Sequence, residues 1–337
     1  MGSHRRLAPS GFDRGALCVL SATAAALGAV STTAVPAGAA PHEDTRAEVD
    51  RLHTAAEKAT EAFNEAGEKA AALRRQVGAS QDRIARQQER VNDLRGRLGA
   101  LAGAQYRTGG LDPSVALLFS DDPEDYLDRA SALDRITTHQ AGELRELQGA
   151  LRDLAQERAE ATRKLGELEK NREAVVRHKR TVEQKLAEAR RLLNSLPSAE
   201  RAAWDRASRS GRADLPEPGA VASGRAGAAL AAARSALGRP YVWGANGPSG
   251  FDCSGLVQWS WAQAGVSLPR TSQAQAHAGH RVPLSQARPG DIVTYRSDAS
   301  HVGMYVGDGQ VIHAPYPGAP VRYDPVGMMP VSAVTRP

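Results

Sequence analysis

The chain has 337 residues, of which 41% are hydrophobic and 24% charged, a balance typical of a soluble protein with room for two domains. The formal net charge is +5 at pH 7, but no basic stripe with interleaved aromatic residues accompanies it, which argues against a nucleic-acid-binding protein. Lysine is absent after position 185 and aromatic residues make up only 4% of the chain, so we expect the packed core to be concentrated in one part of it.

Residues 1–40 have the three parts of a secretory signal peptide. Three arginines lie among the first 14 residues, residues 16–30 are apolar, and the small-residue segment "AVPAGAA" follows, with cleavage expected after Ala39 or Ala40. A membrane anchor is the alternative, but fifteen apolar residues fall short of the roughly 20 needed to span a bilayer. We therefore predict a secreted protein of the cell wall or the extracellular face of the membrane.

Residues 41–209 show the 3-4 spacing of apolar residues that is typical of coiled-coil helices. One seam runs from Val49 to Leu101 and a second from Leu144 to Leu196, each 53 residues long. Two equal seams joined by a compact insert predict an antiparallel helical hairpin, roughly 80 Å long at 1.5 Å per residue. A parallel dimer of the same helices remains an alternative.

The segment between the seams, at about residues 105–140, breaks this pattern. Gly109-Gly110 interrupts the first helix, and the Asp-Pro pairs that end at Pro113 and Pro123 are each typical of a helix start. We expect short helices at this hairpin tip, which either pack on one another or form a surface that docks a partner. They would carry the apolar side chains of Val115, Leu117, Leu118, Phe119, Tyr126 and Leu127.

Residues 210–224 are rich in Gly, Pro and Ser and predict a linker to a compact domain at residues 225–337. From position 224 onward there are nine Arg and no Lys, against five Asp and no Glu, so this domain is basic and suits an anionic wall polymer. Two helices and three strands are predicted in it, at residues 226–238, 253–265, 291–296, 301–307 and 310–314.

Cys253 is the one cysteine left once the predicted signal is removed, so it cannot form an intramolecular disulfide. Asp252 is the expected N-cap of a helix that begins at Cys253, where free backbone N–H groups and the helix dipole favour a thiolate. His301 and His313 lie on one predicted hairpin and could supply a base and a residue that orients it. A buried structural cysteine is an alternative, as is a zinc site of these three residues, although no CxxC or HxxxH spacing supports zinc.

The hairpin turn decides whether the two histidines can meet. Asp308-Gly309 predicts a two-residue type I′ turn, and a regular register through it would place His301 and His313 on opposite faces of the sheet. A three-residue loop or a bulge would instead make them diagonal neighbours on one face. Catalysis by this pair therefore requires a loop with an odd number of residues or a β-bulge.

Four segments of the predicted domain resemble the NlpC/P60 cysteine peptidases of bacterial cell walls, over about residues 225–330. They are "GRPYVWGANGPSGFDCSGLVQW", "LPRTSQAQ", "ARPGDIVTY" and "HVGMYVGDGQVIHAP". The resemblance implies a papain-like α+β fold in which Cys253 is the nucleophile, His301 the general base and His313 the residue that orients it. One departure is Ala245, where the family usually has a glycine, and it affects the shape of a loop near the groove.

The same resemblance assigns four further residues and a reaction. It implies that the Tyr241 hydroxyl lies near the oxyanion and that Asp252, Ser254 and Trp243 line the peptide groove. The implied reaction is hydrolysis of an amide in the peptidoglycan stem peptide, usually the γ-D-glutamyl to diamino acid bond, with no metal or cofactor. An amidase or acyltransferase of the same superfamily and a non-catalytic coiled-coil adaptor are the alternatives.

The N-terminal half is loosely similar to the coiled-coil hairpins of PcsB-type secreted hydrolases, whose tip has a comparable "YRTGG" and "FSDDPEDYLDR" character. This likeness implies that the tip docks to a membrane complex of the FtsEX type. It also implies that the coiled coil restrains the hydrolase until docking occurs.

Overall fold

The computed structural model describes residues 40–107, 123–210 and 224–337, and residues 42–337 form one compact unit. The predicted signal peptide, most of the predicted linker and the middle of the predicted tip lie outside the described residues. No helix within the described ranges carries an apolar stretch long enough to cross a bilayer.

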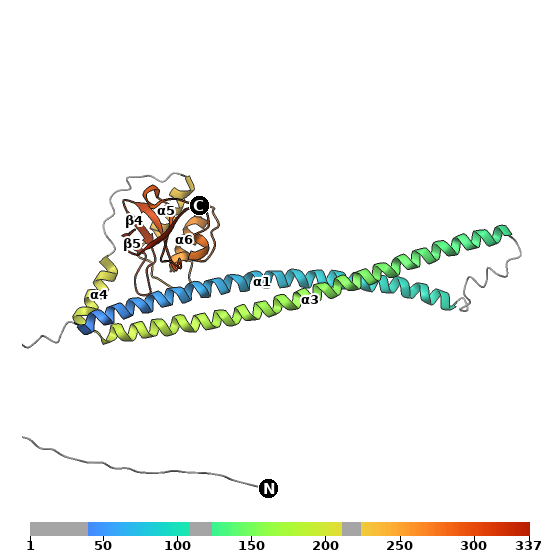
Figure 1. Ribbon diagram of the computed structural model, residues 1–337, viewed down its shortest axis with the longest axis horizontal. Helices are drawn as coiled ribbons and strands as arrows, with labels where there is room; N and C mark the ends of the chain where they lie inside the picture. Colours follow the sequence, from blue (N-terminus) through green and yellow to red (C-terminus); the bar gives the residue numbers. More distant parts are fainter. Residues whose placement is uncertain (1–39, 108–122, 211–223) are drawn as a thin grey trace, which may run out of the picture. The chain divides into compact units, whose positions relative to one another are not determined.

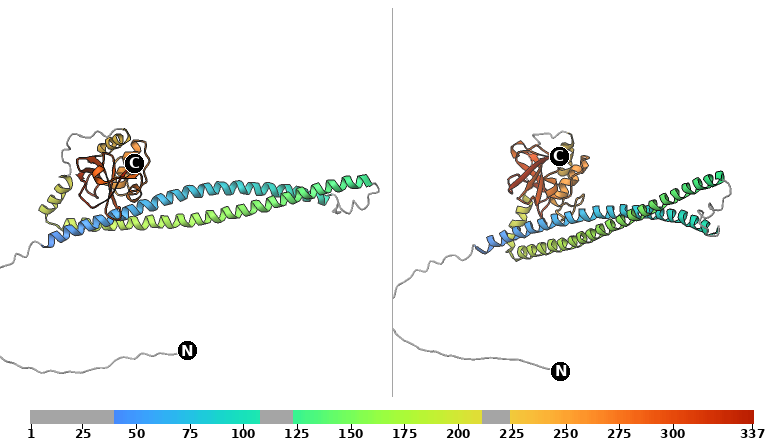
Figure 2. Two further views of the ribbon diagram at one scale, coloured as in Figure 1. Left: turned by 45° about the horizontal axis from the view of Figure 1, so that its top comes forward. Right: turned by 45° about the vertical axis from the view of Figure 1, so that its right-hand side comes forward.

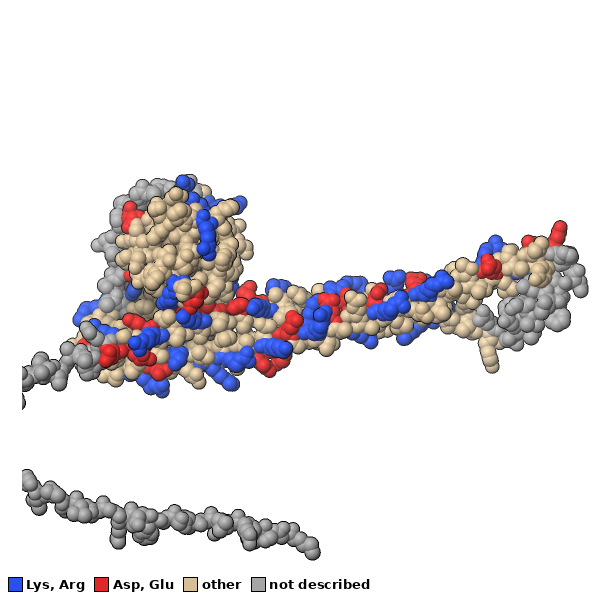
Figure 3. Space-filling model, viewed as in Figure 1, with Lys and Arg blue, Asp and Glu red and all other residues tan. Residues whose placement is uncertain are grey.

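Two long helices, α1 (Ala40–Arg107) and α3 (Pro123–Ser195), lie side by side in the views of Figures 1 and 2. Ion pairs join Arg83 to Glu157 at 3.0 Å and Arg90 to Glu146 at 2.8 Å. Because the partner's number falls as the α1 number rises, the helices are antiparallel, and the predicted hairpin is confirmed. Figure 3 shows basic and acidic side chains interspersed along it.

Most of the first predicted seam is buried or half-buried, with Val49, Val91 and Leu94 almost fully buried, and the last two pack against α3 at Leu154. The second seam is only partly correct. Leu144, Leu151 and Leu165 are 49%, 36% and 48% exposed, while Ala150, which the seam left out, is buried. An α-helix drifts by about 20° per heptad against a strict seven-residue repeat, so a seam drawn at fixed spacing leaves the interface along a long helix.

The second Asp-Pro pair does open a helix at Pro123, but that helix is α3 itself and not a short tip helix. Tyr126 and Leu127 lie in its first turns and are 42% and 65% exposed. No Gly or Pro occurs between Pro123 and Gly142, so nothing in the sequence stops the helix once it has begun. The other predicted tip residues, Val115, Leu117, Leu118 and Phe119, lie outside the described residues.

The C-terminal domain has a six-stranded antiparallel sheet in the order β1-β6-β2-β3-β4-β5, formed by β1 (His280–Arg281), β2 (Ile292–Tyr295), β3 (His301–Gly307), β4 (Gln310–His313), β5 (Arg322–Pro325) and β6 (Val331–Arg336). α6 (Cys253–Gln263) packs on β3 and β4, and α5 (Gly224–Ser235) packs on α6. Leu256, Val302 and Ile312 are among the fully buried side chains of the core between helices and sheet. The domain also has the short helix α7 (Ser272–Gln275) and a 3₁₀ turn (Leu284–Gln286), and helix α4 (Ser198–Ser210) follows α3 before the predicted linker.

The three predicted strands are present within one residue at each end, and three further strands were missed. β1 has two residues, and β5 reads Arg-Tyr-Asp-Pro, a charged segment with a proline. Such segments carry no strand signal of their own, and proline is confined mostly to edge strands. β5 is an edge strand of this sheet, which explains why the composition hid it.

The hairpin between β3 and β4 combines the regular turn with the expected bulge. Asp308 and Gly309 have φ values of 50° and 68°, as a type I′ turn requires. Gly307 pairs with Gln310 next to that turn, but Tyr305 pairs with Val311, so Val306 is an extra residue on β3. The bulge moves the register by one residue, which turns His301 and His313 to the same face of the sheet.

Candidate active site

Cys253 is the first residue of α6, and Asp252 caps this helix as predicted. The Asp252 carboxylate accepts the Gly255 N–H at 2.7 Å, and both Cys253 and Asp252 are buried. A Cβ at Gly255 would lie 2.2 Å from the carbonyl oxygen of Ala245, so only glycine fits there. The same carbonyl accepts the Asp252 N–H at 2.9 Å, a backbone bond that alanine at position 245 leaves intact.

The two histidines form a hydrogen-bonded pair within the core. His301 Nε2 lies 2.8 Å from His313 Nδ1, and the rings meet edge to face. A side chain at Gly303 would crowd this pair, because its Cβ would lie 3.1 Å from the Cβ of His313. The Cys253 sulfur interacts with the backbone N–H of Val302, the residue that follows His301, so the sheet brings the pair beside the thiol.

A third residue, which the sequence analysis missed, continues this pair. His313 Nε2 lies 2.8 Å from an Asp324 carboxylate oxygen, and the same oxygen accepts the Arg322 Nε–H at 2.8 Å. Burial lowers the pKa of His313 to about 4, so its ring is neutral at neutral pH. Asp324 lies in the unpredicted strand β5, and no sequence signal marked it.

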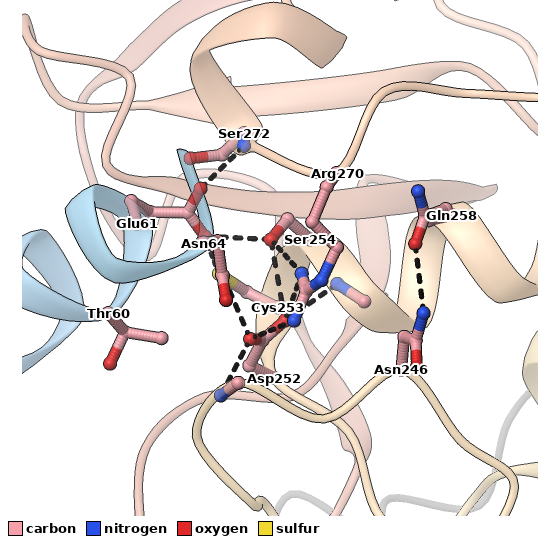
Figure 4. A network of polar contacts seen from close by, with 12 residues as sticks. Thr60, Glu61, Asn64, Asn246, Asp252, Cys253, Ser254, Gln258, Arg270 and Ser272 are labelled. Carbon is pink, nitrogen blue, oxygen red and sulfur yellow. Dashed lines mark hydrogen bonds and ion pairs between the residues drawn. The ribbon is translucent and has the colours of Figure 1, made fainter. Parts of the chain in front are cut away.

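Helix α1 supplies a carboxylate to the candidate nucleophile, as Figure 4 shows. Glu61 Oε1 accepts the Ser254 hydroxyl at 2.7 Å and lies 3.7 Å from the Cys253 sulfur. Glu61 Oε2 accepts the backbone N–H of Ser272 at 2.8 Å. Glu61 is therefore held by three groups of the C-terminal domain, and only 2% of its surface is exposed.

Two more α1 residues complete this contact. Glu57 Oε1 lies 3.5 Å from His301 Nδ1, and its other carboxylate oxygen accepts an N–H of Arg296. Asn64 donates its side-chain N–H to Asp252 at 3.1 Å. Neither the coiled-coil pattern nor the motifs pointed to these residues, because charged side chains along such a helix normally face solvent.

The predicted groove residues Asp252, Ser254 and Trp243 lie where α1 contacts the C-terminal domain. Arg270 donates to both carboxylate oxygens of Asp252 and, at 2.8 Å, to the Ser254 hydroxyl. Trp243 meets the ring of Phe63 from α1 edge to face, with 5.3 Å between centroids. Arg270 belongs to the quoted segment "LPRTSQAQ", so the motif contained it although no role was assigned to it.

The charge state of the site differs from the sequence expectation for the thiol. Burial raises the pKa of Cys253 well above its usual value, and the carboxylates of Glu61, Asp252 and Glu57 raise it further. The thiol form is therefore favoured over the expected thiolate in this arrangement, because burial and the neighbouring carboxylates outweigh the helix dipole. Burial likewise raises the pKa of Tyr241 well above its usual value, so its hydroxyl keeps its proton.

The pKa values of Glu57 and Glu61, the two α1 glutamates at the site, are shifted in opposite directions. Burial raises the pKa of Glu57, but the charges of His301 and Arg296 and the hydrogen bond from Arg296 outweigh it and leave the pKa below its usual value. Burial and then the charge of Asp252 raise the pKa of Glu61 to about 7. At neutral pH, Glu57 is ionised and Glu61 exchanges between its two forms.

In a comparison with known protein families, residues 238–333 match the NlpC/P60 family. A probable endopeptidase of Mycobacterium tuberculosis is 51% identical over 105 residues, which cover 31% of this chain and 27% of that protein. The probable endopeptidase p60 of Listeria monocytogenes is 53% identical over 97 residues, which cover 28% of this chain and 20% of that protein. The solved NlpC/p60 domain of the peptidoglycan hydrolase SagA is 36% identical, covering 33% of this chain and 98% of that chain, with a TM-score of 0.32.

Proposed function

The C-terminal domain of this chain belongs to the NlpC/P60 family, and from that premise we propose that the chain is a secreted cysteine peptidase that hydrolyses amide bonds of peptidoglycan stem peptides. The observation that carries the proposal is the hydrogen-bonded pair of His301 and His313 on strands β3 and β4, where the backbone N–H of Val302, next to His301, interacts with the sulfur of Cys253 at the N-terminus of α6. The match spans only 27% and 20% of the two probable endopeptidases named above, so the substrate and the partners of this chain are proposed from its own residues.

In the proposed reaction, His301 Nδ1 takes the proton of Cys253, and the thiolate attacks the carbonyl carbon of the scissile amide. The backbone N–H of Cys253 and the hydroxyl of Tyr241 stabilise the oxyanion that forms. His301 then gives the proton to the leaving amine as the C–N bond breaks. Water, deprotonated by the same histidine, hydrolyses the thioester, which releases a carboxylic acid and restores the thiol.

Glu61 supports the γ-D-glutamyl bond as the substrate. Its carboxylate is held beside the nucleophile by the Ser254 hydroxyl, by the Ser272 N–H and by the charge of Arg270. A glutamate linked through its γ-carboxyl keeps a free α-carboxylate a few bonds from the scissile carbonyl. We propose that the groups that hold Glu61 hold this α-carboxylate in the substrate, while Asp252 and Trp243 line the rest of the groove.

The position of Glu61 also supports a role for the coiled coil as a restraint. Cys253 is 2% exposed and His301 is fully buried, so a stem peptide reaches them only after α1 moves away. Glu61 then leaves the carboxylate site, Glu57 leaves His301, and Phe63 leaves Trp243. We propose that this movement activates the enzyme.

A membrane complex of the FtsEX type, docked at the tip, is the proposed trigger of this movement. Apolar side chains are exposed on both helices where they approach the tip, with Tyr106 86%, Leu127 65% and Ile136 48% exposed. Exposed apolar surface at this end of the hairpin favours a docking site over mutual packing. The likeness of the hairpin to PcsB-type hydrolases stays a prediction.

Mass spectrometry of digested sacculi tests the proposed bond. The assay uses the wild-type chain and a chain with Glu57→Lys and Glu61→Lys, called the opened variant, in which like charges replace the two carboxylates beside Arg296 and Arg270. We expect products cut between D-glutamate and the diamino acid. Fragments cut between sugar and peptide would indicate the amidase alternative, and undigested sacculi with both proteins would support the adaptor alternative.

Selectivity for the free α-carboxylate is a separate prediction. Muropeptides whose D-glutamate carries an α-carboxamide are expected to be cut about 10- to 100-fold more slowly by the opened variant, because an amide loses a charge-assisted interaction at the Glu61 site. Competition between acid and amide substrates, followed by mass spectrometry, measures the ratio. Equal cleavage rates for the acid and amide muropeptides would show that the enzyme does not recognise the substrate's α-carboxylate.

Docking of α1 is expected to weaken as the pH rises from 6.5 to 8.5. The docked pKa of Glu61, about 7, lies above its undocked value, so the docked state holds a proton that is lost through this window. Glu57 stays ionised throughout, and Cys253 stays a thiol because burial raises its pKa well above its usual value. Burial lowers the pKa of His53, which stacks on Tyr316, so the proton of this group favours the undocked state and opposes the effect of Glu61 only at the lower end of the window.

From the pKa of Glu61, the docking equilibrium should fall about fourfold over those two pH units. Hydrogen exchange of the Ser272 amide, corrected for its intrinsic pH dependence, measures this equilibrium, because that amide donates to Glu61. The decrease should be absent in Glu61→Gln, where the titrating group is removed. A wild-type protection factor that stays constant or rises with pH would contradict the prediction.

A further inference from the structure

A line of hydrogen bonds leads from the candidate base to the edge of the sheet. His301 of β3 meets His313 of β4, and His313 meets Asp324 of β5, with 2.8 Å between the bonded atoms at both steps. His313 pairs with Arg322 in the β4–β5 register, so Asp324 is its diagonal neighbour on the same face. Arg322 donates to the same Asp324 oxygen and completes the line.

The chemistry of these groups fixes where each proton lies. Burial raises the pKa of Asp324, but the hydrogen bonds of His313 and Arg322 and the charge of Arg322 outweigh it, so the side chain is an anion that only accepts. His313 Nε2 must therefore carry the proton that bonds Asp324. Because the His313 ring is neutral, its Nδ1 is bare and accepts the Nε2–H of His301.

This arrangement of protons leaves His301 Nδ1 as the ring nitrogen that can gain and lose a proton. It has no hydrogen-bond partner within the described parts of the chain, and the nearest charged group is Glu57 of α1, at 3.5 Å. When α1 moves away, the same nitrogen is free to take the proton of Cys253. In the other tautomer, His313 would donate its Nδ1–H to His301 Nε2. His301 would then carry its proton on Nδ1 and could not accept the proton of Cys253 there.

We propose that Asp324 is a positioning residue of this enzyme, which holds His313 in the Nε2–H tautomer and thereby keeps His301 Nδ1 available to Cys253. Arg322 holds the carboxylate in place. The role in catalysis rests on the proposed peptidase function, whereas the control of the ring protons is a property of the chain itself. As His301 takes the thiol proton, its positive charge is stabilised through His313 by the Asp324 anion.

A purely structural role is the competing explanation, in which Asp324 and Arg322 only fasten the edge strand β5. The two explanations differ in what Asp324→Asn does. Asparagine has the same shape but no charge. In one orientation its oxygen still accepts from both His313 and Arg322, and in the other its amide donates to His313 Nε2 and favours the other tautomer, so the two tautomers should mix. A structural clip would change the melting temperature and leave the histidine protons as they are.

The test uses the full chain with ¹⁵N-labelled histidine. Long-range ¹H–¹⁵N spectra of the ring nitrogens should give Nε2–H for both His301 and His313 in the wild type, and a mixed or inverted tautomer in Asp324→Asn. Asp324→Glu, which keeps the anion, should restore the wild-type pattern at least in part. Asp308→Asn, in the exposed turn of the β3–β4 hairpin, is the matched control and should leave the spectrum unchanged.

Hydrolysis by the opened variant gives the second readout. An Asp→Asn change directly beside a catalytic histidine costs about 10⁴ in kcat in serine proteases, and Asp324 acts one ring further away, so we expect a loss of about 10- to 100-fold. The loss should fall on kcat and shift the pH profile, with KM little changed. Asp324→Glu should recover part of kcat, and Asp308→Asn should match its parent.

The outcomes separate this inference from the proposed function. Unchanged ring tautomers and kcat in Asp324→Asn, with or without a lower melting temperature, would overturn the role of Asp324. Failure of the opened parent to hydrolyse any sacculus would instead count against the peptidase proposal, and the ring spectra would still decide whether Asp324 sets the protons.

Discussion

Replacing Cys253 with alanine is expected to abolish hydrolysis, lowering the rate by about 10⁴-fold or more, because members of a nucleophile and base unit act together and lose nearly all activity when one is removed. His301→Ala should do the same, since the thiol then has no base. His313→Ala should cost less, because a residue that orients the base contributes less directly. Rates of stem-peptide release by the opened variant and its three derivatives measure the series.

The fold should survive these substitutions, which makes the series interpretable. Cys253 contributes a small buried side chain, so alanine removes a single sulfur atom from the N-terminus of α6, and Asp252 still caps the helix. Circular dichroism and the melting temperature provide the control, together with Cys253→Ser, which keeps the size of the side chain. Equal and partial losses in all three alanine variants would contradict the assigned roles.

The candidate catalytic pair could be predicted from the sequence because its signals are local. Asp252 precedes an apolar run and caps it, and the Asp308-Gly309 turn marks the hairpin. The period of two along a strand then shows that His301 and His313 meet only through an odd loop or a bulge. The structure has the bulge at Val306, a residue that nothing in its own identity singles out.

Asp324 and the two α1 glutamates could not be predicted in the same way. Asp324 lies in a strand whose charged, proline-containing sequence resembles a loop. Glu57 and Glu61 occupy helix positions where a charged residue usually faces water, and Glu61 lies 192 residues from the thiol that it contacts. A heptad pattern specifies which face of α1 meets α3, but it carries no information on what covers the other face.

The opened variant, with Glu57→Lys and Glu61→Lys, is expected to raise the alkylation rate of Cys253 by about 100-fold or more. Glu57 forms a buried ion pair with Arg296, and Glu61 lies between Ser254 and the Ser272 N–H, near Arg270. Removing one partner of a buried pair costs about 3–5 kcal/mol, and here each lysine also repels an arginine. These costs fall on the docked state alone, because lysine has a high helix propensity and α1 itself should persist.

Alkylation by iodoacetamide, read by mass spectrometry of the peptide that contains Cys253, measures access to the thiol without assuming any substrate. The matched control is Glu65→Lys with Glu68→Lys, which makes the same charge change at exposed positions of α1 one to two turns further along. The control should behave as the wild type. Hydrolysis of sacculi should rise in parallel with alkylation in the opened variant.

Deleting residues 41–215 removes the restraint by a second route. The core of the C-terminal domain is built from its own side chains, between Ala229 and Tyr323, so the remaining domain should fold and be at least as active as the mature protein. If both the opened variant and the deleted chain alkylate no faster than the wild type, α1 does not close the site. A folded fragment with an accessible thiol but no hydrolysis would show instead that the coiled coil assists catalysis, because opening would then expose the nucleophile without producing an active enzyme.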